Sequence, residues 1–319
     1  MIVTLTANPG LDRTASLGEP LVRGGVNRIL GTTVDPGGKG INVARVVLAA
    51  GHPVRAILPA GPRDPILAEL ERVHLPYRSI PLAEPARVNL TLTEPDGTTT
   101  KVNEPGPTLT ADAVEQLANL LVVESEHADW VVLSGSLPPG VPTDWYASLV
   151  RALRPWGGRV AVDTSDAPLL ALAAQFPQAA PDLLKPNSEE LAQLTGADAT
   201  RLESEAKAGD PSGTVAAARR LVERGVGAVM ATLGAAGAVL VCAEGAWVAT
   251  PPAITVRSTV GAGDSSVAGY ILAETRGAAW PERLREAVAY GSAAAALAGT
   301  TLPLPDQLDR EAVRVRAVE

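Results

Sequence analysis

Cysteine and closely spaced histidine are both scarce in this chain of 319 residues. The single cysteine, Cys242, excludes an intrachain disulfide and a cysteine-based metal site. The three histidines, His52, His74 and His127, are far apart and lack the spacing of metal ligands. Since 46% of the residues are hydrophobic and 19% are charged, we expect a globular fold instead of a disordered chain.

Basic residues are fewer than acidic residues in this chain. The chain has 27 Lys and Arg against 35 Asp and Glu, a formal net charge of −8. An acidic chain is a poor candidate for non-specific nucleic-acid binding. The N-terminus lacks the basic and apolar regions of a signal peptide. The uncharged stretch 225–243 contains glycines and splits into two β-like runs, which favours a buried hairpin over a membrane span. We therefore expect a soluble cytoplasmic protein that binds neither nucleic acid nor membranes.

Two familiar nucleotide-binding motifs are missing. Gly38-Lys39 does not belong to a Walker A loop, because Thr33 stands five positions before Gly38 and Gly40 follows the lysine. No G-x-G-x-x-G follows the first expected strand, which disfavours a dehydrogenase. The turn that does occur, residues 35–40, opens an amphipathic helix that ends near Gly51. Alone, it is a weak sign of anion or polyol binding, and a plain glycine turn explains it almost as well.

The order of predicted elements indicates an α/β fold. Between residues 130 and 243, strand-like and helix-like segments alternate, which predicts a parallel sheet with helices on both faces. We expect residues 203–210 to form a loop or a frayed helix, and a short helix to close the chain.

A second, smaller sheet is also expected. Residues 87–94 and 98–103 alternate with period 2 around Asp96-Gly97, a strong hairpin signal. Together with the β-like segment after Gly24, this hairpin could form a lid. The whole chain, 1–319, is then one domain whose lid comprises about residues 11–35 and 86–105. Arg87 and Lys101 could face an anion there, although a solvent-facing role explains Lys101 better.

Polar residues follow several expected strands. Asp12 falls just past the first strand, where open α/β sheets often bind ligands, although a solvated turn aspartate is commoner. The expected strand 159–163 ends in an acid. Asn187 and Glu190 open a helix after Lys185, and their spacing fits either a capping box or a pair near a metal-bound phosphate.

The stretch 258–266 places Gly261, Gly263 and Asp264 at the start of a helix. Free N–H groups and the helix dipole make such a turn an anion site. Asp264 could take a proton from a hydroxyl while the N–H groups hold the phosphate that this hydroxyl attacks. These nine residues alone favour a simpler interpretation, in which Asp264 is only an N-cap.

Five motifs occur in one order. They are Asn8-Pro-x-x-Asp12, Gly37-Gly38-Lys39-Gly40-Ile41-Asn42-Val43-Ala44, Ser134-Gly135-Ser136-Leu137-Pro138, Lys185-Pro186-Asn187-x-x-Glu190 and Thr259-Val260-Gly261-Ala262-Gly263-Asp264-Ser265. Together they resemble the ribokinase-like sugar kinases of the PfkB family, over residues 2 to 300. The resemblance implies a ribokinase-like, doubly wound and mostly parallel sheet with helices on both faces and a small β-sheet lid. In that family the lids commonly pair across a dimer, so a homodimer through the lid is expected.

The resemblance implies ATP-dependent phosphorylation of a primary hydroxyl on a sugar phosphate, with Mg²⁺. The lysine-containing motif is most similar to that of kinases that convert fructose 1-phosphate to fructose 1,6-bisphosphate. Kinases of tagatose 6-phosphate or fructose 6-phosphate remain alternatives. A non-catalytic sugar-phosphate or nucleotide sensor is disfavoured, because the Gly261–Asp264 run is intact.

The implied roles follow the motifs. Asp264 is expected to be the general base, and the N–H groups of Gly261, Ala262 and Gly263 are expected to hold the transferred phosphoryl group. The residues expected to bind the sugar phosphate are Asp12, Gly38, Lys39, Asn42, Arg87, Ser136 and Asp264, with Lys39 and Arg87 on its phosphate. Those expected along the nucleotide are Lys185, Asn187, Thr232, Gly234, Gly237, Gly261 and Gly263. Asn187 and Glu190 are expected to hold Mg²⁺.

Overall fold

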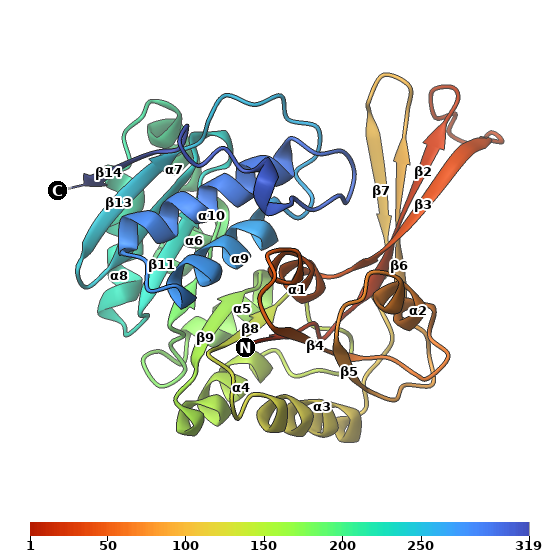
Figure 1. The fold of residues 1–319 in the computed structure, drawn as a ribbon, viewed down its shortest axis with the longest axis horizontal. Coiled ribbons are helices and arrows are strands. Elements are labelled where there is room, and N and C mark those ends of the chain that lie inside the picture. The colour runs from red at the N-terminus through yellow and green to blue at the C-terminus, as the bar shows by residue number, and fades with distance from the viewer. Residues whose placement is uncertain (319) are drawn as a thin grey trace.

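The computed structural model describes residues 1–318 as an α/β fold with two sheets (Figure 1). The larger sheet has the strand order β14 (Arg314–Val318), β13 (Gly245–Thr250), β12 (Ala238–Cys242), β11 (Ala228–Thr232), β10 (Leu183–Leu184), β9 (Arg159–Asp163), β8 (Trp130–Ser134), β1 (Ile2–Leu5), β4 (Val54–Pro59) and β5 (Tyr77–Ile80). Neighbouring strands from β11 to β5 are parallel, and those from β11 to β14 are antiparallel. The expected mostly parallel sheet is therefore confirmed.

Helices cover both faces of this sheet. One face carries α1 (Lys39–Ala49), α2 (Pro65–Arg72), α9 (Ala262–Thr275) and α10 (Trp280–Ala295). The other carries α3 (Ala111–Glu124), α4 (Trp145–Leu153), α5 (Asp166–Ala173), α6 (Ser188–Thr195), α7 (Ala199–Lys207) and α8 (Ser212–Glu223). Alternate strand residues serve the two cores: in β8, Val131 and Leu133 pack on one side and Trp130 and Val132 on the other. Because both faces are buried, these strands are almost continuously apolar.

The second sheet stands apart from the larger one and projects from the molecule (Figure 1). Its strand order is β3 (Ile29–Gly37), β2 (Gly10–Leu17), β6 (Arg87–Thr93) and β7 (Thr99–Asn103). The predicted hairpin is confirmed, since β6 and β7 pair antiparallel around Gly97, which has φ 91°. Asp96 Oδ1 closes this turn by accepting a hydrogen bond of 2.8 Å from the Thr98 N–H.

Asp12 lies inside β2, opposite Asn89 and Asp35, so its expected place in a turn is wrong. The sequence of β2 lacks a clear strand pattern, because it contains a glycine and charged residues. Few of its side chains are buried, among them Ala15 and Leu17.

The structure differs from the sequence predictions at the C-terminal segment and at residues 203–207. The short C-terminal helix is wrong, because residues 314–318 form β14 and pair with β13 at the edge of the larger sheet. Exposed Arg314 and Arg316 flank the less exposed Val315, but Ala317 is exposed too, so the period-2 pattern covers only the first three residues of β14. Residues 203–207 belong to the regular helix α7, which begins after the N-cap Asp198 and buries Leu202 and Ala206.

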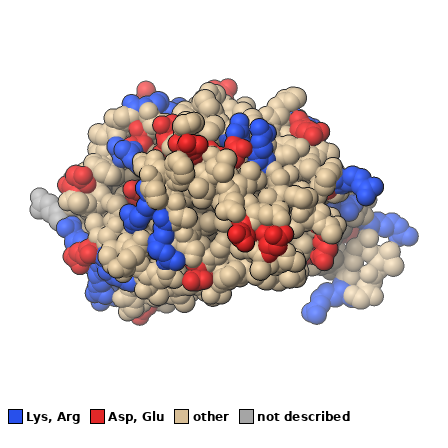
Figure 2. Space-filling model, turned by 90° about the horizontal axis from the view of Figure 1, so that it is seen from below, with Lys and Arg blue, Asp and Glu red and all other residues tan. Residues whose placement is uncertain are grey.

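The uncharged stretch 225–243 contains the antiparallel pair β11–β12, which confirms the predicted hairpin. None of the helices within residues 1–318 is long and apolar enough to cross a membrane. On the face shown in Figure 2, basic and acidic side chains are interspersed.

Candidate active site

Polar residues gather where the parallel strands end. Ser134, the last residue of β8, lies opposite Asp163, the last residue of β9. The Lys185 N–H, just past β10, donates to the Val162 carbonyl, which brings Lys185 beside Asp163. Farther along the same edge, Thr232 forms a bridge with Asn187. This edge is where open parallel sheets bind ligands.

The first turn of α9 faces this edge. Gly261 is its N-cap, with φ 76°, and it supplies no side-chain cap. The N–H groups of Gly263 and Asp264 have no acceptor within residues 1–318, as expected for the first turn of a helix. Asp264 is three positions past the N-cap, so the interpretation as an N-cap is wrong. Its Oδ2 instead accepts a buried hydrogen bond of 2.8 Å from Asn42 Nδ2.

The surroundings of Asp264 favour a base that works near neutral pH. Burial of the carboxyl and the nearby charge of Asp163 raise the pKa of Asp264 to about 6. Lys39, the hydrogen bond from Asn42, and Lys185 act in the opposite direction. Asp264 is therefore largely ionised at pH 7, with a proton affinity suited to general-base chemistry.

Two lysines share one carboxylate oxygen beside Asp264. Asp163 Oδ1 accepts a hydrogen bond from Lys39 Nζ at 2.8 Å and forms an ion pair with Lys185 Nζ at 3.2 Å. Burial alone would lower the pKa of Lys39, but Asp163 and Asp264 outweigh it and hold that pKa above its usual value. Burial would raise the pKa of Asp163, but Lys185 and Lys39 hold it below its usual range.

Asp163 is a site residue that the sequence did not identify. The available signal was an acid at the end of a buried strand, next to strands that end in Ser134 and Lys185. Lys39 was assigned to the sugar phosphate, but its contact in the structure is with Asp163.

A second group of polar side chains lies on the smaller sheet. Asp12 Oδ1 accepts a hydrogen bond of 2.9 Å from Asn89 Nδ2, and burial raises the pKa of Asp12 above its usual value. A Cβ on Gly37 would lie 2.3 Å from Asp12 Oδ2, so only glycine fits there. Arg87 is half-buried, and its buried Nε has no hydrogen-bond partner within residues 1–318.

The turns between the two sheets connect these groups. Asn8 Nδ2 donates to Ser136 Oγ at 3.3 Å and to the Pro105 carbonyl at 3.0 Å, which connects the 134–140 loop to the segment that follows β7. Gly38 is the N-cap of α1 and has φ 113°. A side chain on Gly38 would collide with Thr6, 2.6 Å from the Cβ position.

A largely apolar cavity of about 400 Å³ adjoins the first turn of α9. Its lining includes the predicted nucleotide residues Thr232, Gly234 and Gly237, together with Ala262 and Gly263. Gly291 and Ser292 of α10 line it too. Gly291 also permits close helix packing, because a Cβ there would lie 2.3 Å from Ser266 Oγ. A neighbouring cavity of about 540 Å³ is lined by Lys185, Asn187, Ser188, Glu189, Thr232 and Thr259, among others.

Comparison with known proteins gives this site a family. The family model for "pfkB family carbohydrate kinase" matches residues 13–307. The chain belongs to the pfkB family of carbohydrate kinases.

Two relatives and one solved structure show how far the likeness extends. A 1-phosphofructokinase of Rhodobacter capsulatus is 37% identical over 312 residues, which cover 96% of this chain and 94% of that protein. The ATP-dependent 6-phosphofructokinase isozyme 2 of Escherichia coli is 34% identical over 305 residues, 94% of each. The structure of Escherichia coli phosphofructokinase-2 with potassium has a TM-score of 0.87 and 33% identity over 96% of each chain. The chain is thus a phosphotransferase of a family that uses ATP, with the ribokinase-like fold.

Asn187 and Glu190 are the two residues expected to hold Mg²⁺. Asn187 Oδ1 accepts from the Glu190 N–H, and Glu190 Oε2 accepts from the Asn187 N–H, both at 2.8 Å, so the capping box is formed. The other carboxylate oxygen of Glu190 has no hydrogen-bond partner within residues 1–318. In the same range no three His, Cys, Asp or Glu side chains are placed to hold a metal. Since Mg²⁺ keeps several waters, one free carboxylate oxygen fits it.

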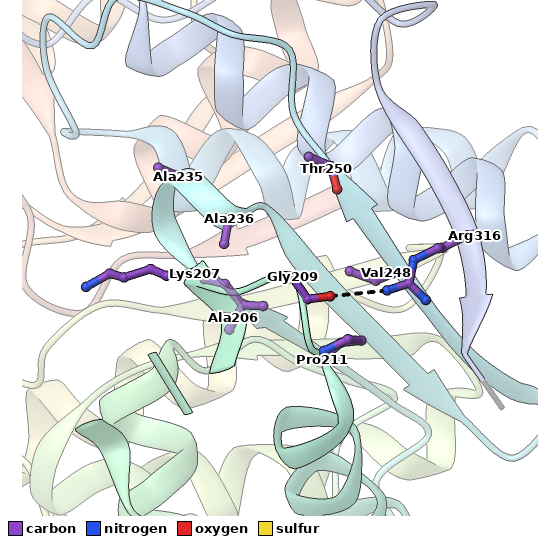
Figure 3. Close-up of a pocket in the computed structure, with 10 residues that line it drawn as sticks. Ala206, Lys207, Gly209, Pro211, Ala235, Ala236, Val248, Thr250 and Arg316 are labelled. Atoms are coloured by element: carbon purple, nitrogen blue, oxygen red, sulfur yellow. Dashed lines mark hydrogen bonds between the residues drawn. The ribbon is translucent and has the colours of Figure 1, made fainter. Parts of the chain in front are cut away.

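Another pocket of this carbohydrate kinase, also of about 400 Å³, opens behind the turn at residues 234–236 (Figure 3). The Arg316 guanidinium donates to the Gly209 carbonyl there at 3.4 Å. Lys207 Nζ lies 3.7 Å from a carboxylate oxygen of Glu203. Both cations of this pocket have partners within the protein.

Proposed function

We propose that this carbohydrate kinase transfers the γ-phosphoryl group of ATP to the free primary hydroxyl of fructose 1-phosphate, giving fructose 1,6-bisphosphate and ADP. The observation that carries the proposal is the buried Asp264 carboxylate, at the open first turn of α9 and bonded to Asn42. The 37% identity with the 1-phosphofructokinase of Rhodobacter capsulatus supports the choice of sugar.

In this proposal Asp264 accepts the proton of the sugar hydroxyl as that hydroxyl attacks the γ-phosphoryl group. The N–H groups of Gly261, Ala262 and Gly263 stabilise the charge on the phosphoryl oxygens. Phosphoryl transfer requires chiefly positioning and charge stabilisation, and the first turn of a helix supplies both.

The sugar phosphate would lie between the end of the larger sheet and the smaller sheet, which acts as a lid. Asp12, Asn42, Ser136 and the Gly38 backbone would hold its hydroxyls. Arg87, whose Nε has no protein partner within residues 1–318, would meet the phosphate already on the sugar. Because a carboxylate and an amide suit hydroxyls and a guanidinium suits a dianion, the donor set matches a phosphorylated sugar.

The nucleotide would run from the apolar cavity to the first turn of α9. Its base would lie near Gly291 and Ser292, where a flat ring fits between small residues. Lys185, Thr232, Gly234 and Gly237 would follow the rest of the nucleotide. Asn187 and Glu190 would hold Mg²⁺ through its waters, and the ion would neutralise charge on the ATP phosphates.

We also propose that the lid pairs with the lid of a second copy. Several large apolar side chains are exposed on it, with exposed fractions that reach 83% at Val26 and 77% at Leu30. Apolar side chains gathered on a small projecting sheet are typical of a surface that another protein covers. A cytoplasmic location follows from the proposed chemistry, since ATP and sugar phosphates are cytoplasmic metabolites.

The substrate assignment is tested by ADP release, measured with ATP and each of fructose 1-phosphate, fructose 6-phosphate, tagatose 6-phosphate, fructose and ribose. We expect the highest kcat/KM with fructose 1-phosphate. The 34% identity with the 6-phosphofructokinase isozyme 2 makes fructose 6-phosphate the second candidate. A preference for unphosphorylated ribose would overturn the proposal.

A further inference from the structure

Asp163 is a buried acid with an unusual set of contacts. Its side chain is only 2% exposed, yet one oxygen, Oδ1, forms ion pairs with two ammonium groups, those of Lys39 and Lys185. The other oxygen, Oδ2, is buried and has no hydrogen-bond partner within residues 1–318. A carboxylate that served only to stabilise the fold would be expected to have both oxygens satisfied.

The two lysines reach Asp163 from different parts of the fold. Lys39 is the first residue of α1, and Lys185 directly follows β10. Lys185 Nζ lies 3.5 Å from the position that a Cβ on Gly263 would occupy, so it is in contact with the first turn of α9. The charge of Asp264 also raises the pKa of Lys39.

We propose that Asp163 is a positioning residue for phosphoryl transfer, which holds the ammonium groups of Lys39 and Lys185 beside the first turn of α9, where the transferring phosphoryl group would lie. The inference rests on the proposed function in that it takes this turn as the phosphoryl site. It also places Lys39 at the reacting end of the sugar and leaves the phosphate already on the sugar to Arg87.

The physical reason is that two neighbouring ammonium groups repel each other and are costly to bury. A carboxylate between them offsets both effects and fixes the two ammonium groups before the substrates arrive. Fixed charges of this kind stabilise a transition state without having to reorganise during the reaction. Asp163 acts through the lysines and does not itself touch the reacting atoms.

The variant Asp163→Asn keeps the side-chain shape and removes the charge. We expect kcat to fall by about 100-fold, comparable to the loss of one fixed donor to a developing oxyanion, with a small change in the KM for fructose 1-phosphate. The matched control is Asp182→Asn, because the exposed Asp182 lies at the other end of the same strands, where it accepts from the Val160 N–H. This control should keep kcat.

The pH profile separates positioning from mere support of the fold. The titratable groups that face Asp264 are Asp163, Lys39 and Lys185. Removing the negative charge in Asp163→Asn should lower the pKa of Asp264 and move the acidic limb of kcat/KM to lower pH. Removing a positive charge in Lys39→Met should move it to higher pH. A loss of folded enzyme alone would lower the amplitude of the profile and leave its acidic limb in place.

A binding measurement keeps the inference separate from the choice of sugar. Calorimetry would compare ADP with a non-hydrolysable ATP analogue, with Mg²⁺ and without sugar. We expect wild type to bind the analogue more tightly than ADP, and Asp163→Asn to lose most of that preference. If Asp163→Asn does not fold, Lys39→Met and Lys185→Met should each weaken the preference.

The outcomes are distinct. An Asp163→Asn enzyme with wild-type kcat, or with an unchanged preference for the analogue, would overturn the inference. If wild type does not phosphorylate fructose 1-phosphate while Asp163→Asn still loses the preference, the substrate assignment is wrong and the role of Asp163 stands.

Discussion

Asn42 Nδ2 lies 2.8 Å from Asp264 Oδ2, and this buried hydrogen bond joins the first turn of α1 to the first turn of α9. The two residues are 222 positions apart in the sequence. The bond brings the lysine-containing glycine turn and the acid-containing glycine turn into one site. It also favours the ionised form of Asp264, since an amide N–H donates best to a carboxylate.

This bond predicts the pH behaviour of the variant Asn42→Ala. The hydrogen bond from Asn42 lowers the pKa of Asp264, whose value in the intact protein is about 6. Without the bond, the pKa of Asp264 rises. The carboxylate therefore becomes protonated, and stops acting as a base, at a higher pH than in wild type. We expect the acidic limb of kcat/KM to move upward and activity to fall more at pH 6 than at pH 8. A profile from pH 5 to 9 measures this, and an unchanged midpoint would contradict it.

A matched pair of glycine variants tests the position of Asp12. In Gly37→Ala the new methyl would push against Asp12 Oδ2, 2.3 Å from the Cβ position. We expect the KM for the sugar phosphate to rise at least 10-fold while the KM for ATP stays within about 2-fold, as lost positioning predicts. The control is Gly31→Ala in the same strand, where nothing lies within 4 Å of the Cβ position. Equal effects of the two variants on the sugar KM would reject the role of Asp12.

Arg87 is expected to bind the phosphate already on the sugar. Its replacement by alanine should raise the KM for fructose 1-phosphate by about 10- to 100-fold, the worth of a charge-assisted contact, and leave the KM for ATP unchanged. Lys101→Ala, an exposed cation on β7 of the same sheet, is the control and should change neither value. Steady-state kinetics with each substrate varied in turn decides the matter. An equal rise in both KM values for Arg87→Ala would move Arg87 out of the sugar pocket.

The proposed lid pairing predicts a change of mass. Leu30→Asp places a charge on the lid, at a leucine that is 77% exposed. We expect sedimentation to show a dimer for wild type and a monomer for this variant, because a charge is costly to bury in an apolar interface. The control Val123→Asp changes a 67% exposed valine on α3 and should leave the dimer intact. A monomeric wild type would refute the pairing.

Elements with a strong local pattern were predictable from the sequence. Strands such as β8 are buried on both faces and read as apolar runs, and Asp96-Gly97 marks its hairpin by turn chemistry alone. Strand β2 was not predictable, because it buries few side chains and pairs on one side with β6, which lies far along the sequence. The final strand β14 likewise depends on a partner far away in the sequence, β13.

Some residues of the candidate site were likewise predictable from the sequence, and others were not. The ordered motifs predicted that Asn42 and Asp264 both bind the sugar phosphate, and the structure places the two side chains in contact. Asp163 carried no motif signal, since its importance comes from the two lysines that converge on it. The spacing of Asn187 and Glu190 fitted both a cap and a metal site, and the structure shows that the cap is made.

The most direct test of the central claim is the turnover of Asp264→Asn with ATP and fructose 1-phosphate. Both substrates should still bind, and kcat should fall by about 10²- to 10⁴-fold, the usual contribution of a positioned base. Folding can be checked in parallel. The pKa of Asp264 rises from 3.8 to about 6 on folding, so its ionised form costs stability above pH 6. The variant should therefore melt higher than wild type at pH 8, and the difference should vanish below about pH 4. A folded Asp264→Asn enzyme with near-normal kcat would contradict the account.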